Sequence, residues 1–141
     1  MIVQTSCTIF ALNLLKGLED FSSTSTQIYK IALYNANANL DNATTAYTSV
    51  NEVTGAGYTV GGQVLTPTSL GSDTTNNTAF VSFNNVTWTP ASFTTRGALI
   101  YNSTTGAAVF VLNFGSDKTP NGTFTVTFPT ANSTNAIIRI T

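Results

Sequence analysis

The chain has no histidine, a single cysteine and very few charged residues. Its 141 residues include five Lys or Arg and six Asp or Glu, so only 8% are charged, against about 25% in an average domain. The lack of histidine removes the commonest general base and the commonest metal ligand. The single cysteine, Cys7, excludes an intrachain disulfide. The formal net charge of −1 provides no basic surface for nucleic acid or anionic lipid, so we expect neither as a partner.

Two targeting signals are also missing. No basic residue precedes the apolar residues of MIVQTSCTIFALNLL and no small-residue cleavage site follows them, so we expect no secretion by a signal peptide. No apolar run approaches the ~20 residues of a membrane span, so we expect no membrane partner.

Threonine and asparagine are abundant and together form about 30% of the chain, while 42% is hydrophobic. Threonine is β-branched and favours strands, and asparagine and glycine favour tight turns. The hydrophobic content is too high, and the net charge too low, for a disordered chain. The composition therefore predicts a folded β protein with an uncharged polar surface, and the length indicates a single domain over 1–141.

The segment FALNLLKGLEDF predicts a short amphipathic helix over about residues 8–19, in which Gly17 weakens the last turn. The residues at apolar helical spacing are Phe10, Leu14, Leu15, Leu18 and Phe21, and those opposite are Asn13, Lys16, Glu19 and Asp20. Such a helix covers its own core or docks on a partner. We favour the first, because most amphipathic helices cover their own sheet.

Period-two patterns predict strands from about residue 26 to 140. The first, around 28–34, is apolar on both faces and is expected to be buried on both sides. The others are expected at Ala46–Val50, Tyr58–Leu65, Ala79–Phe83, Val86–Trp88, Ala98–Asn102, Ala107–Phe114, Gly122–Pro129 and Ala136–Ile140. About seven to nine short strands with one terminal helix predict a mainly β fold, either an antiparallel β-sandwich or a partly open barrel. Trp88 and Phe93 are expected to fill the core.

The glycines of NEVTGAGYTVGG have nearly the spacing of a phosphate-binding loop. Such a loop joins a strand to a helix, whereas QVLTPTSLG has strand character, contains Pro67 and offers no Gly-Lys-Ser/Thr. We interpret the glycines as two bends, with Gly55 or Gly57 at positive φ in the first and Gly61–Gly62 in the second.

No pattern indicates catalysis. No histidine or G-x-S-x-G elbow is present to activate a hydroxyl, and only Glu19 and Asp20 are adjacent among the carboxylates. The segment GSDKTPNG partly matches a calcium-binding loop that begins at Asp117, but position twelve of that pattern, which needs a bidentate Glu, is Phe128. We therefore expect a non-enzymatic protein without cofactor, metal or small-molecule substrate. Arg96, at the entry to an apolar strand, is expected to pair with a carboxylate of the fold or to reach a neighbour at an interface.

Four segments in order are similar to a family of small tailed-bacteriophage virion proteins: LLKGLEDFSSTSTQIYKIALY, TTAYTSVNEVTGAGYTVGG, VTWTPASFTTRGALIYN and VLNFGSDKTPNGTFTVTFP. The resemblance runs from about residue 12 to the end of the chain. It implies a virion component assembled in the host cytoplasm, such as a capsid decoration (cement) protein, or alternatively a tail, neck or fibre component. It also implies the major capsid protein or further copies of this chain as partners, and a homo-oligomer.

A carbohydrate-binding β-sandwich is the alternative from another class, with Trp88, Tyr101 and Tyr58 as stacking faces. For the virion role, the candidate interfaces are the helix, the loop around 35–45, the glycine segment and Arg96. The individual candidates are Phe10, Leu14, Leu18, Gly57, Tyr58 and Arg96.

Overall fold

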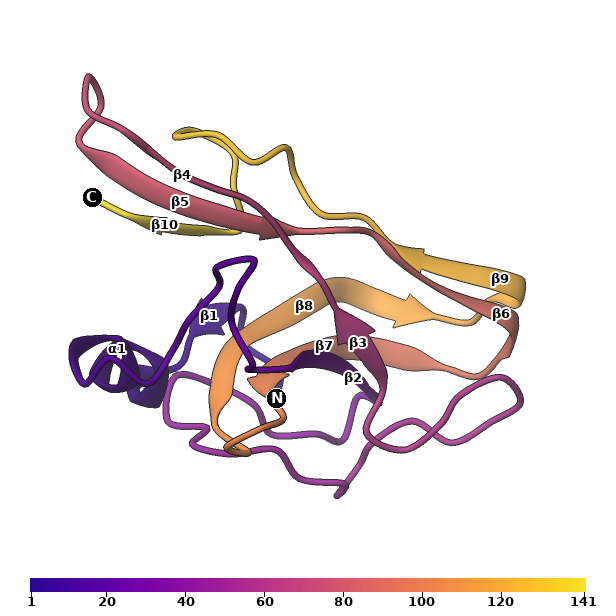
Figure 1. The fold of residues 1–141 in the computed structure, drawn as a ribbon. Coiled ribbons are helices and arrows are strands. Elements are labelled where there is room, and N and C mark those ends of the chain that lie inside the picture. Colours follow the sequence, from indigo (N-terminus) through magenta and orange to yellow (C-terminus); the bar gives the residue numbers. More distant parts are fainter.

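The computed structural model describes residues 1–141 as a mainly β protein with one short helix (Figure 1). The elements are β1 (Thr5–Ser6), α1 (Thr8–Leu15), β2 (Tyr29–Tyr34), β3 (Gln63–Leu65), β4 (Pro67–Asp73), β5 (Thr78–Phe83), β6 (Val86–Ser92), β7 (Thr95–Asn102), β8 (Ala108–Lys118), β9 (Asn121–Val126) and β10 (Ile138–Ile140). They form a five-stranded sheet in the order β1-β8-β7-β2-β3, a three-stranded sheet β10-β5-β4 and a two-stranded ribbon β6-β9, with every pair of strands antiparallel. The predicted sandwich-like or open β class is confirmed.

The five-stranded sheet is covered on both faces, as the apolar pattern of β2 predicts. On one face, Tyr29 stacks on Phe21 with ring centroids 4.5 Å apart and lies 6.4 Å from Phe83 of β5. On the other face, Tyr101 of β7 stacks on Tyr47 at 4.6 Å. Tyr47 belongs to the long connection between β2 and β3. In Figure 1 this connection runs below the five-stranded sheet, while β4, β5 and β10 lie above it.

One hydrophobic cluster of 30 buried residues extends from Ile2 to Ile138 and joins the layers. Trp88 is 1% exposed within it, and Phe93 is also buried, which confirms both as core residues. Trp88 packs against Phe124 of the paired strand β9, where the alternating pattern TFTVTF turns Phe124 and Val126 inward. The outward threonines of the two strands meet in pairs, such as Thr87 with Thr125 at 2.9 Å.

The helix is shorter than predicted, because α1 ends at Leu15 rather than near residue 19. Gly17 adopts φ +68°, and the Leu18 and Gly17 amides donate to the carbonyls of Asn13 and Leu14. This is the hydrogen-bond pattern of a Schellman cap, in which a left-handed glycine ends a helix. The predicted polar and apolar faces are also wrong in part, since Asn13 is buried while Leu15 is 88% exposed.

The strand predictions fail in three regions. Residues 46–50 contain only an isolated bridge from Ala46 to Ala107, and of residues 58–65 only Gln63–Leu65 form a strand. The strand β4 was not expected, because its sequence PTSLGSD is polar and mostly uncovered. It is a strand because it pairs with β5, across an irregularity at which Ser69 adopts φ +51°. The single helix, at eight residues, is too short to cross a bilayer.

Candidate functional site

The connection between β2 and β3, residues 35–62, is the first candidate site, and we call it the β2–β3 loop. It contains no regular helix or strand, although it far exceeds the length of about 12–15 residues above which such loops are uncommon and usually functional. Isolated contacts hold it to the sheet, including hydrogen bonds from the Val53 amide to the Leu33 carbonyl and from the Tyr34 hydroxyl to the Thr48 carbonyl. The loop is therefore an ordered surface on a rigid scaffold.

Glu52 organises the β2–β3 loop from within. Its side chain is buried, with 5% of the residue exposed, and it accepts three hydrogen bonds. The Tyr47 hydroxyl donates to Oε2 at 2.6 Å, and the Tyr58 hydroxyl and the Gly61 amide donate to Oε1 at 2.5 and 2.7 Å. No lysine or arginine pairs with Glu52, because the one salt bridge of the protein lies elsewhere. A buried carboxylate is tolerable only when donors satisfy it, so these three donors fix the course of the loop.

The phenols around Glu52 are held in their protonated, donating form. Burial raises the pKa of Tyr58 and Tyr47 far above the ordinary tyrosine value, and their hydrogen bonds to Glu52 raise it further. Burial likewise raises the pKa of Tyr34 and Tyr101, with the charge of Glu52 as a second cause. The protonated phenols and the Glu52 carboxylate therefore form a hydrogen-bonded hub that holds the loop together.

The glycine segment belongs to this loop, and its bends are those predicted. Gly57 adopts φ +84° and Gly62 φ +71°, and Gly61 is also at positive φ. A Cβ on Gly57 would lie 1.5 Å from the Pro90 carbonyl oxygen, and one on Gly62 would lie 1.8 Å from that of Ile31. The glycines thus allow the loop to lie directly on β6 and β2 of its own chain.

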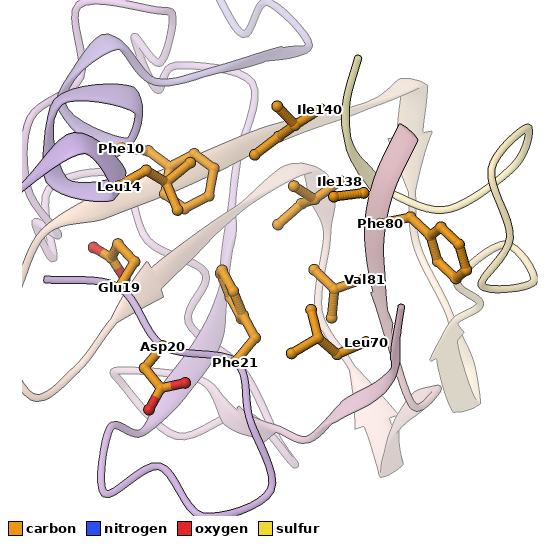
Figure 2. Close-up of a pocket in the computed structure, with 11 residues that line it drawn as sticks. Phe10, Leu14, Glu19, Asp20, Phe21, Leu70, Phe80, Val81, Ile138 and Ile140 are labelled. Atoms are coloured by element: carbon orange, nitrogen blue, oxygen red, sulfur yellow. The ribbon is translucent and has the colours of Figure 1, made fainter. Parts of the chain in front are cut away.

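The second candidate site is an apolar pocket of about 240 Å³ between α1 and the three-stranded sheet (Figure 2). Phe10 and Leu14 project into it from the helix, toward Ile138 and Ile140 of β10. Leu70, Phe21 and residues of β5 complete the lining. Phe10 is buried, but Leu70 and Ile140 remain 56% and 53% exposed, so the pocket opens to solvent beside exposed apolar side chains.

Two carboxylates flank this pocket, and their environments differ. Glu19 is engaged, because Oε2 accepts from the Tyr29 hydroxyl at 2.8 Å and from Asn102 Nδ2 at 3.0 Å. Asp20 is exposed, and hydrogen bonds from the backbone and side chain of Ser22 lower its pKa. The pocket therefore joins an apolar lining to one free negative charge at its edge.

The structure distributes the predicted interface residues over separate places. Phe10 and Leu14 line the pocket, and Leu18 is 47% exposed just beyond the helix. Gly57 and Tyr58 lie in the β2–β3 loop, about a quarter of the chain further on. Arg96 lies on β7 and forms a salt bridge with Asp117 at 3.4 Å. This contact is the first of the two alternatives expected for Arg96, a pairing with a carboxylate of the fold.

The stacking faces proposed for a carbohydrate are largely covered. Trp88 is 1% and Tyr101 5% exposed, and Tyr58 packs its ring against Trp88 and Phe93. These three aromatics consequently contribute to the core and the loop hub rather than to a stacking platform.

Sequence reasoning missed Glu52, which is the central residue of the β2–β3 loop. A signal existed, because Glu52 is the one charged residue between Asp41 and Asp73 and it stands between two tyrosines, Tyr47 and Tyr58. An isolated carboxylate in such a neutral stretch needs local donors if the stretch folds.

Nowhere in the protein do three His, Cys, Asp or Glu side chains gather as a metal-ligand cluster. Comparison of the chain with family models, curated proteins and solved structures finds no match.

Proposed function

We propose that the chain is a non-enzymatic virion structural protein that decorates and stabilises a phage head. The resemblance of four ordered segments to small phage virion proteins suggests this setting. The observation that carries the proposal is the β2–β3 loop, which is long and ordered, contains no lysine or arginine, and has only Asp41 as a partly exposed charge.

The surface of the β2–β3 loop suits contact with another protein. Its only ionisable carboxylates are Glu52, which is buried, and Asp41, which is partly covered, and it contains no lysine or arginine. The central parts of protein interfaces are depleted in charged residues. Val50 and Val60 project from the loop with 67% and 61% of their surface exposed, and they offer apolar contact area.

The hub at Glu52 adds preorganisation. A loop that is already ordered loses little conformational entropy on docking, so more of the contact energy appears as affinity. A modest contact of this kind, repeated by the symmetry of a shell, gives a large total stabilisation. This is the physical requirement for a decoration protein, which adds contacts across subunit joints without chemistry.

The experiment is to purify phage particles, test for the protein, and compare intact particles with particles that lack it. We expect the protein to co-sediment with the heads, and its loss to lower the temperature or osmotic shock at which the heads break. Rebinding of Val60→Glu to depleted heads should be weaker than that of the native protein, because the loop would bury an unpaired charge. Val64→Glu on β3, where the native side chain is 57% exposed, is the matched control and should rebind normally. Purified particles without the protein would refute the proposal.

Copy number separates the head role from the alternative in the tail, neck or a fibre. Decoration predicts copies over the whole shell, whereas a tail or neck component is present in a small symmetric multiple at one vertex. Quantitative mass spectrometry of purified particles decides between them.

A further inference from the structure

The outer surface of α1 is unusual, because the helix is apolar on nearly all sides. Its sequence TIFALNLL contains six apolar residues, yet only Phe10 and Asn13 are buried. Leu15 is 88%, Leu12 43% and Leu18 47% exposed. Helices that are hydrophobic all round are normally buried on all sides. The exposed side of α1 therefore has the character of a surface that is covered in an assembly.

The pocket between α1 and β10 lies next to this exposed surface. It is lined by Leu14 of the helix and opens beside Ile140 and Leu70, both more than half exposed. One short segment, Leu15–Asp20, thus begins with an exposed leucine and ends at the edge of the apolar pocket, where Glu19 and Asp20 lie (Figure 2).

Two charges of opposite sign in this segment have no ion-pair partner within the chain, although Asp20 Oδ1 accepts a hydrogen bond from the Ser22 amide. Lys16 and Asp20 are both exposed, and neither forms a salt bridge within the chain, whose one ion pair joins Arg96 to Asp117. The Leu15–Asp20 segment therefore presents a free cation beside its protruding leucine and a free carboxylate beside its pocket.

We propose that this end of the molecule binds a second copy of the same chain about a twofold axis. Leu15 of each copy enters the pocket between α1 and β10 of the other, and Lys16 of each copy lies against Asp20 of the other. In a twofold interface each surface must complement itself, so that residue i contacts j and j contacts i. This end of the molecule meets the requirement because one copy carries the exposed Leu15 and the apolar pocket, and also both halves of the ion pair, Lys16 and Asp20.

This inference rests on the proposed function in one respect: it names a second copy of the chain as one partner of a protein that works in an assembly. It is tested on the isolated chain, without particles. A monomer in solution would refute the twofold contact and leave virion location untouched, whereas absence from particles would refute the function and leave the dimer standing.

The test is analytical ultracentrifugation of the full chain over a concentration series at low salt. We expect a monomer–dimer equilibrium in the native protein. Leu15→Glu should weaken the dimer roughly tenfold or more, because it places a charge in an apolar pocket. Since Leu15 contacts little of its own fold, circular dichroism should show an unchanged fold. Val64→Glu introduces the same charge at an exposed apolar residue on β3 that does not line the pocket, and it should dimerise like the native protein.

A charge swap tests the pairing directly. Lys16→Glu and Asp20→Lys should each weaken the dimer by about fivefold at low salt, through like-charge contact, and the double variant should recover most of the loss. A native protein still monomeric at millimolar concentration would overturn the proposal. So would a dimer that Leu15→Glu leaves intact, a higher ring in place of the dimer, or a double variant as weak as its two parents.

Discussion

Removal of the Glu52 side chain is the most direct test of the hub that holds the β2–β3 loop. Glu52→Ala leaves three donors without their acceptor: the hydroxyls of Tyr47 and Tyr58 and the amide of Gly61. Tyr58 is the most affected, because its ring is packed against Trp88 and Phe93 and its hydroxyl already accepts from the Leu33 amide.

The expected cost follows from how far water can replace each lost contact. The cost of a donor left without an acceptor is about 1–3 kcal/mol, and it applies most to Tyr58, which is partly exposed as a residue but whose ring packs against Trp88 and Phe93. Tyr47 and Gly61 are partly exposed and can turn to water, so each loses only about 0.5–1 kcal/mol, the net value of an ordinary hydrogen bond. The sum is about 3 kcal/mol, a large part of the 5–15 kcal/mol by which typical domains are stable.

Glu52→Gln is the matched control and should cost no more than about 1 kcal/mol. Its amide oxygen can take the place of Oε1 and accept from Tyr58 and Gly61. Its amide group then faces Tyr47, whose hydroxyl can accept a hydrogen bond as well as donate one. The side chain thus keeps all three contacts without a buried charge.

The assay is urea denaturation at pH 7, with the free energy of unfolding and the m-value compared among the three proteins. Amide hydrogen exchange at Gly61 adds a local measurement, and it should accelerate in Glu52→Ala before the core strands do. The reasoning is refuted if Glu52→Ala costs less than about 1 kcal/mol, or if Glu52→Gln costs as much as Glu52→Ala.

Three further predictions concern stability and reactivity. Gly62→Ala should destabilise by about 3 kcal/mol or more in urea denaturation, because its Cβ would lie 1.8 Å from the Ile31 carbonyl oxygen. Gly106→Ala, at φ +81° with open space around it, should cost only about 1–2 kcal/mol, and equal costs would contradict the close approach. Burial raises the pKa of five tyrosines in the folded protein above the value of about 10 expected in the unfolded chain. Their contribution to the free energy of unfolding is therefore complete below pH about 10 and decreases at higher pH. The decrease is about 1.4 kcal/mol per pH unit for each phenol that stays protonated in the folded state. Urea denaturation from pH 8 to 11.5 checks this, and a flat profile above pH 10 would contradict it. Cys7 is 1% exposed, with its pKa raised to about 11 by burial and by Asp41, so at pH 8 it should react with a thiol reagent only after unfolding.

Local sequence patterns were sufficient to predict the structure where the burial of side chains follows a regular repeat along the chain. The alternation in NGTFTVTFP predicted which side chains of β9 face inward, and the two-sided apolar pattern predicted that β2 lies between two covering layers. The bends at Gly57 and Gly62 could also be anticipated, since positive φ is a property of a residue and its immediate neighbours.

Local patterns failed where the partner lies far along the chain. The polar segment PTSLGSD becomes β4 only because β5 supplies its hydrogen bonds. Helical periodicity across FALNLLKGLEDF assumed one continuous helix, but the Schellman cap at Gly17 ends α1 after Leu15, whose side chain is exposed. Phe10 and Leu14 line one pocket with Ile138 and Ile140 of β10, so the two ends of the chain lie close together, and no local pattern encodes such a pairing.

The sequence by itself determined the class of the protein: β strands rich in threonine, glycine bends and a surface with little charge. Those properties arise from side-chain shape and polarity over a few residues. The tertiary structure alone decided that Glu52 is buried among tyrosine hydroxyls, and that an exposed leucine stands beside an apolar pocket. Both depend on which distant segments the closed fold brings together, because the free energy of a buried charge or an exposed apolar side chain is set by its neighbours in space.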